Sequence, residues 1–262
     1  MSIYVPFRRS VFCPRLSMLF VLGATLLLAS CANVTPAPVS ESTSTGNEAF
    51  TPFTQIMQQG DARANTVVTT VGYAYADDAG VRLVDTLSFS AGPTPQPLAP
   101  PQQQLWIGNP PPNQLVPLLR TAGTARVAPV RTRGTFAGPG QFGPQGNYQY
   151  KLNDPNFDLL VPQDVTFETL FASGTMYENR FVRIVGTLFV QGSSGLLVEK
   201  TDANGVPASG ARQVKLSTPV RDTALLARLH QARDQNVHFG AVQVEGFWRD
   251  GALLPLALFP TS

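Results

Sequence analysis

The chain has 262 residues, enough for two ordinary domains, and 43% of them are hydrophobic, which excludes disorder along its whole length. Only 14% are charged, and the 23 prolines and 22 glycines indicate many turns and short strands rather than long helices. The formal net charge of +2 gives the chain no strong electrostatic bias toward nucleic acid.

The first thirty residues have the pattern of a secretory signal. Arg8, Arg9 and Arg15 precede an apolar run over residues 18–29, which is too short to cross a bilayer as a permanent helix. Removal of this leader leaves 16 basic and 17 acidic residues. We therefore expect a nearly neutral mature chain without a nucleic-acid partner.

The apolar run ends in Leu28-Ala29-Ser30-Cys31, which resembles the bacterial lipobox of one aliphatic residue, two small residues and a cysteine. The resemblance implies that a diacylglycerol is attached to Cys31 and that the leader is cleaved before it. Each buried methylene contributes about 0.8 kcal/mol, so two or more acyl chains anchor a protein stably. This implies an extracytoplasmic protein held on the cell membrane, or on the outer membrane of a double-membrane cell. The alternative is an ordinary signal peptide or uncleaved anchor with an incidental cysteine.

The stretch over residues 31–50 is rich in Pro, Ser and Thr and has no apolar period. This composition predicts a solvated, disordered tether between the lipid and the folded part. Cys31 is the only cysteine outside the leader, residues 1–30, so the mature chain cannot form an internal disulfide.

The remaining sequence contains two similar units. A shift of 114 positions places residues 53–85 over residues 167–199 without a gap, with eight identities where average composition gives roughly two by chance. The identical pairs are Phe53/Phe167, Gly60/Gly174, Asn65/Asn179, Val68/Val182, Val71/Val185, Gly72/Gly186, Leu83/Leu197 and Val84/Val198. A shift of 112 continues the match from 130–136 to 242–248. We expect a tandem duplication over residues 51–160 and 161–262; the alternative is two unrelated β segments that share a Val-Gly turn.

Each unit is expected to follow the same order of elements. The first contains a helix over 53–59, strands over 66–76, 81–89 and 103–107, a helix over 114–122, and strands over 127–136 and 148–152. The second contains a helix over 167–173, strands over 180–190, 196–200 and 212–216, a helix over 222–233, and strands over 238–248 and 253–259. Val182, Ile184, Leu188 and Val190 alternate with other residues, as on a strand with one buried face. Asp222 is predicted to cap the last helix.

The order of three strands, a helix and two strands resembles the OB-fold, a five-stranded, partly open Greek-key barrel. Gly72 and Gly186 fall in the middle of the first strand of each unit, where a small barrel must coil sharply. We expect an all-β protein with short helices, built as two tandem five-stranded OB-like barrels.

The sequence offers no recognisable catalytic or metal-binding pattern. It has two histidines, His230 and His238, and neither has an equivalent in the first unit. Motifs such as H-E-x-x-H, paired C-x-x-C and G-x-S-x-G are absent from the sequence. The adjacent Asp77 and Asp78 are typical of a solvated hairpin turn, since a cation site needs more converging ligands. We expect no catalytic residue, no metal and no cofactor.

A ligand patch is predicted on the first unit, because OB barrels bind with strands two and three and with the loops after strands one and four. Aromatic and arginine side chains there can stack on bases or sugar rings. The candidates are Phe89, Trp106, Arg131, Arg133, Phe142, Tyr148 and Tyr150. The alternative is that Trp106 and Tyr150 belong to the core. The second unit offers Lys200, Arg212 and Lys215 without aromatic neighbours.

These observations favour a noncatalytic binding or scaffolding module that holds an envelope protein or glycan near the membrane. One alternative is an OB-type binder of oligonucleotides or oligosaccharides. Another is an envelope hydrolase, which would require carboxylates such as Asp77, Asp78, Asp85 and Glu199 to converge.

Overall fold

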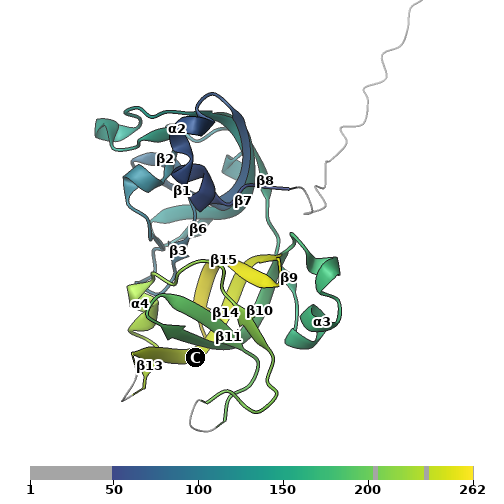
Figure 1. The fold of residues 1–262 in the computed structure, drawn as a ribbon. Coiled ribbons are helices and arrows are strands. Elements are labelled where there is room, and N and C mark those ends of the chain that lie inside the picture. Colours follow the sequence, from purple (N-terminus) through teal and green to yellow (C-terminus); the bar gives the residue numbers. More distant parts are fainter. Residues whose placement is uncertain (1–48, 203–205, 233–235, 262) are drawn as a thin grey trace, which may run out of the picture. The chain divides into compact units, whose positions relative to one another are not determined.

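The computed structural model describes residues 49–202, 206–232 and 236–261 (Figure 1). The predicted leader, the Leu28–Cys31 motif and nearly all of the tether lie outside these described residues. As expected, the described part is mostly β with a few short helices. It falls within one compact unit.

Sheet A forms a closed five-stranded barrel in the first half of the chain. Its order is β1 (Val67–Asp77), β2 (Gly80–Val84), β5 (Leu105–Gly108), β8 (Tyr150–Leu159) and β7 (Ala125–Ala137), with the short β6 (Arg120–Ala122) added to β7. The barrel closes because β1 also pairs with β7 over ten residue pairs. The third and fifth strands, β5 and β8, run parallel, and the other barrel pairs are antiparallel.

Sheet B has the same strand order in the second half but is not closed. Its main strands are β12 (Gln213–Lys215), β11 (Ser194–Val198), β10 (Phe181–Gln191), β14 (Val237–Arg249) and β15 (Ala252–Pro260). Within the described ranges, β12 and β15 form no ladder, so the expected closure of a second barrel is not observed. β12 is only three residues long, and a single isolated bridge, between Leu216 and Leu253, stands where a ladder to β15 would close the sheet. β3 (Leu87–Ser88), from the first half, pairs with β15 farther along, at Ala257 and Leu258.

Short strands complete sheet B. β3 also pairs with β4 (Gln96–Pro97), while β9 (Gln163–Asp164) runs parallel to β10 and β13 (His230–Gln231) pairs with β14. The single strand predicted over 81–89 is therefore wrong. The chain leaves sheet A after Val84 and joins sheet B at Leu87, a change of partner that local sequence does not encode.

The helices are shorter than predicted. The α-helices are α1 (Phe53–Gln58), α2 (Gly60–Arg63), α3 (Phe167–Ala172) and α4 (Thr223–Leu226); the 3-10 turns are η1 (Pro101–Gln103), η2 (Val116–Leu118), η3 (Pro144–Gly146) and η4 (Gly174–Tyr177). The helix predicted over 114–122 is wrong, because Pro117 limits it to one turn and the chain then enters β6. The helix predicted over 222–233 ends at Leu226. Its predicted cap is confirmed, since Asp222 Oδ1 accepts the Leu225 N–H at 2.9 Å.

Three apolar clusters hold the strands together. One fills the interior of barrel A, including Leu83, Leu105 and Phe136. A second lies within sheet B and contains the predicted alternating residues of β10, all buried. The third, here called the shared core, draws side chains from both sheets: Phe50, Val71, Tyr73, Tyr75, Val84, Leu87, Ala125, Val127, Leu160, Phe181, Phe247, Leu256 and Ala257.

Equivalent residues of the two units occupy equivalent backbone positions. Asn65 and Asn179 both adopt left-handed conformations, with φ of 60° and 57°. Each donates its backbone N–H at 2.8 Å, Asn65 to the Phe136 carbonyl and Asn179 to the Trp248 carbonyl. Asparagine is one of the few residues that tolerate this conformation, which explains its identity at both positions.

The mid-strand glycines are also equivalent. A Cβ added to Gly72 would lie 2.4 Å from the Val84 carbonyl oxygen, and one added to Gly186 would lie 2.9 Å from that of Val198. In each unit the first strand therefore approaches the second too closely for any larger residue, as expected where a small barrel coils.

Candidate functional site

The predicted ligand patch is divided among several places. Trp106 and Tyr148 lie together, with ring centroids 5.0 Å apart, but each side chain is almost fully buried. Tyr150 belongs to the interior of barrel A, where its ring lies 4.9 Å from that of Phe136. Its hydroxyl donates to Asp61 at 3.2 Å. Tyr150 is therefore a core residue, as the alternative prediction held.

The other patch residues point elsewhere. Phe89 packs against Tyr73 and Phe259, beside the shared core. Arg131 is buried, because its partner across the ladder is Val71, on the section of β1 that packs into the shared core. Arg133, two residues further on, is exposed, and Phe142 forms an isolated bridge with Tyr148. These side chains do not form one continuous platform.

A charged cluster that the sequence analysis did not predict surrounds Arg82 on β2. Its guanidinium binds both carboxylate oxygens of Asp77, at 2.8 and 2.7 Å, and lies 4.4 Å from the centre of the Tyr75 ring. The bond to Arg82 is the main reason why the pKa of Asp77 is lowered. Both charges of this pair are thus satisfied within the protein.

The loop between β7 and β8 lies against these aromatic rings. A Cβ added to Gly143 of this loop would lie 3.0 Å from Trp106 and 2.6 Å from Tyr148. The part of barrel A predicted to bind a ligand is therefore packed against this loop. Access to Trp106 would require the loop to move.

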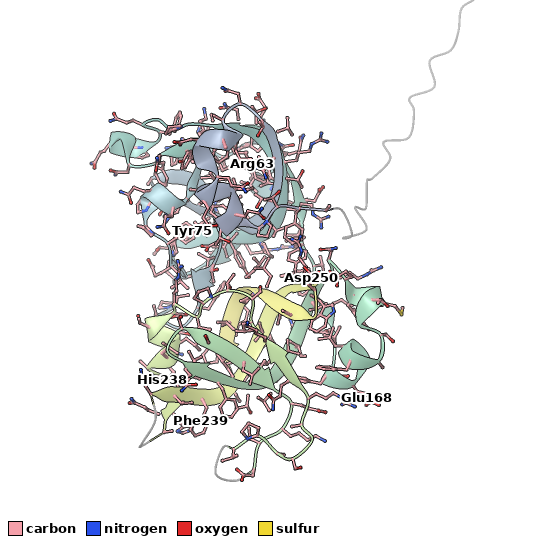
Figure 2. The ribbon with its side chains drawn as sticks, viewed as in Figure 1. Arg63, Tyr75, Glu168, His238, Phe239 and Asp250 are labelled. Carbon is pink, nitrogen blue, oxygen red and sulfur yellow. The ribbon has the colours of Figure 1, made fainter. Side chains whose placement is uncertain are left out.

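The carboxylates required by a hydrolase lie in different surroundings. Asp77 is bound to Arg82, Glu199 is bound to Arg212 at 3.2 Å, and Asp78 is exposed in the hairpin turn. Among the described residues, no group of three or more His, Cys, Asp or Glu side chains is placed to hold a metal ion. His230 is exposed on β13, and His238 lies near the start of β14, beside Phe239 (Figure 2).

Asp85 instead lies in a small, mainly apolar pocket at the edge of the shared core. The pocket has a volume of about 70 Å³, which is enough for several water molecules or the polar end of a ligand. It is lined by residues of α1, β1, β15, the segment after β2 and the loop before α4: Pro52, Phe53, Thr54, Val71, Asp85, Thr86, Leu98, Ala99, Thr218, Pro219, Val220, Arg221, Leu254, Pro255, Leu256 and Leu258.

One carboxylate oxygen of Asp85 is unsatisfied. Oδ1 is buried and has no hydrogen-bond partner within the described ranges. Burial raises the pKa of Asp85, while the Thr86 backbone N–H and the charge of Arg221 act in the opposite direction. A buried carboxylate that lacks full hydrogen bonding destabilises a protein, so this oxygen is suited to accept a bond from a ligand.

The sequence contains one signal that pointed toward this residue. Asp85 aligns with Glu199 of the second unit, where the acid is satisfied by Arg212 across the neighbouring strand. The corresponding segment of the first unit leaves sheet A, so Asp85 lacks such a partner there and faces the pocket. The sequence alignment does not show that Glu199 is paired with an arginine while Asp85 is not; only the structure shows this difference.

Comparison with protein families, with curated proteins and with solved structures found no match to this chain. In the part of the chain that the structure describes, no helix combines the length and apolar character needed to span a membrane.

Proposed function

We propose that this chain is a lipid-anchored extracytoplasmic protein that acts as a noncatalytic binding module near a membrane. The Leu28–Cys31 motif supports the anchor, and the composition of residues 31–50 supports a tether of adjustable reach. The partner is an envelope protein or glycan that the tethered part holds close to the bilayer.

We further propose that both halves are OB-like units that arose by duplication, the first closed into a barrel and the second open. The barrel order in sheet A recurs as the strand order of sheet B. An isolated parallel bridge between Leu216 and Leu253 stands where β5 pairs with β8 in the first half. The equivalent left-handed Asn65 and Asn179 support a common origin.

The unsatisfied Asp85 Oδ1 is the observation that carries the binding role. A partly buried carboxylate whose Oδ1 is enclosed in an apolar pocket discriminates for a group that donates hydrogen bonds, above all an ammonium group, which would also neutralise its charge. The pocket is too small for a whole glycan or peptide. It accepts one terminal group of the partner, while the surrounding surface contacts the remainder.

An OB-type binder of oligonucleotides or oligosaccharides has less support. Trp106 and Tyr148 are almost fully buried, and Arg82 is already bound to Asp77. The near-neutral mature chain also lacks the excess positive charge that binding to phosphates requires.

The anchor is tested by metabolic labelling with a radioactive fatty acid in a bacterial host. We expect the wild-type chain to incorporate label and Cys31→Ser to incorporate none and to retain its leader, because the thiol is the attachment point. Cys13→Ser is the matched control and should be labelled like the wild type. Equal labelling of the Cys31 variant would exclude the lipoprotein proposal.

The pocket is tested by calorimetric titration of the full chain with n-butylammonium chloride, with sodium chloride as the ionic-strength control. We expect saturable binding to the wild type and none to Asp85→Asn, which keeps the size of the side chain but removes its charge. Saturating ligand should also raise the melting temperature of the wild type alone, since ligand at 100 times Kd stabilises by about 2.7 kcal/mol. Identical titrations of the two proteins would refute this site.

A further inference from the structure

One side of sheet B repeats a surface that sheet A buries. The ladder between β10 and β14 has the register of the ladder between β1 and β7 when the alignment shifts of 114 and 112 are applied. Val71 then corresponds to Val185. The cross-strand pair of Tyr75 and Val127 corresponds to the pair of Phe189 and Phe239.

The two surfaces differ in what covers them. Val71 is 1% exposed within the shared core, whereas the identical residue Val185 is 57% exposed. Tyr75 and Val127 are buried in the same way. Phe189 and Phe239 are only partly buried and stack on each other with ring centroids 5.9 Å apart. Figure 2 shows Phe239 well apart from Tyr75.

The uncovered side of β10 and β14, here called the outer stripe, contains no ionisable side chain. It consists of Val185, Thr187, Phe189, Phe239, Ala241 and Gln243. At one end it is bounded by the ion pair of Arg183 and Glu245, at 2.8 Å, and at the other by His230, whose ring lies 5.6 Å from that of Phe239.

The outer stripe continues an interface that already exists within the chain. Beyond the Arg183–Glu245 pair, the same side of these strands carries Phe181 and Phe247, which pack into the shared core. Glu245 is only 7% exposed, so the covered part of sheet B extends to this ion pair. One part of this face of sheet B, at Phe181 and Phe247, packs against sheet A, and the outer stripe is the part that remains uncovered.

We propose that the outer stripe binds the outer stripe of a second copy of this chain. A two-fold interface pairs the same surface patch on both copies, so a neutral face of valine, alanine and aromatic side chains meets another neutral, largely apolar face without placing like charges together. Thr187 and Gln243 can each donate and accept hydrogen bonds across such an axis. The equivalent face of sheet A is not available to a partner, because sheet B residues already cover it.

Site-specific photo-cross-linking of the full chain in bacterial cells tests this interface. We replace Phe189 or Phe239 by p-benzoylphenylalanine and use Phe171, an exposed residue of α3, as the matched control. Irradiation should produce a species of twice the chain mass from both outer-stripe positions and none from the Phe171 position. Adducts only to lipid or to a different protein, or no adduct from the outer stripe, would overturn the proposal.

A charge placed on the outer stripe gives an independent measurement. Val185→Asp should lower the yield of the Phe189 cross-link at least about tenfold, because dimer formation would bury two carboxylates, one from each copy. Met176→Asp, at a similarly exposed position outside the outer stripe, should leave the yield unchanged. Ala241→Lys should have the effect of Val185→Asp, and circular dichroism confirms that each variant is folded. An undiminished yield in both folded variants would contradict the proposal.

Discussion

Replacement of Phe247 by alanine should lower the free energy of unfolding by about 3–5 kcal/mol, the range found for large-to-small changes at fully buried aromatic residues. Phe247 is completely buried, and its ring lies 4.6 Å from that of Phe50 and 5.3 Å from that of Phe181. Because the shared core contains residues of both sheets, we expect both halves of the chain to lose stability together.

The two tryptophans allow this to be measured for each half separately. Trp106 lies in sheet A and Trp248 in sheet B. In a Trp106→Phe background only Trp248 remains, so its fluorescence during urea denaturation reports unfolding of the second half. In a Trp248→Phe background Trp106 reports unfolding of the first half. With Phe247→Ala added, both reporters should shift to lower urea by similar amounts.

Phe171→Ala is the control, since this ring is 50% exposed on α3 and its removal should change the unfolding free energy by less than about 0.5 kcal/mol. A shift seen by Trp248 alone would mean that the halves unfold independently. In that case the shared core contributes little to the stability of barrel A.

Several strand features were predictable because they depend on local signals. The period of two along β10 identified the buried side of the strand, and Gly72 and Gly186 marked the positions where the first strand closely approaches the second. Asp222 identified the start of α4. Each of these signals depends on residues close in sequence, so tertiary contacts did not override them.

The departures arise where a distant segment decides the structure. β3 leaves the expected strand because β15, about 170 residues later, offers a parallel partner at Ala257. Nothing in the composition of Leu87 and Ser88 distinguishes a strand of one sheet from a strand of the other.

The dispersal of the predicted patch has a similar cause. Arg131 and Arg133 are two residues apart on β7 and share one side of the strand, as their spacing predicts. Only Arg133 is exposed, because the section containing Arg131 lies beside residues that pack into the shared core. A strand pattern shows which residues share a side, but it does not show what covers that side.

Replacement of Asp85 by asparagine should increase the free energy of unfolding at pH 7 by about 1–2 kcal/mol, because it removes a partly buried charge that is incompletely hydrogen-bonded. The pKa of Asp85 is raised in the folded protein above its ordinary value of 3.8. The folded state therefore binds the proton more tightly than the unfolded state, and the wild type loses stability as the pH rises from 3.8 through the raised pKa. The advantage of the variant should be present above that pKa and disappear as the pH falls toward 3.8.

Urea denaturation of wild type and variant between pH 4 and pH 8 measures this dependence, with Asp78→Asn as the control for an exposed carboxylate in the neighbouring hairpin turn. The control should show no such gain at any pH. A residue that lowers stability and yet binds n-butylammonium has the trade-off expected of a functional site, where a ligand supplies the interaction that the fold leaves out. If Asp85→Asn instead destabilises the protein at pH 7, the carboxylate stabilises the folded protein through Arg221 and the Thr86 N–H. That result would contradict the proposal that the pocket binds a ligand.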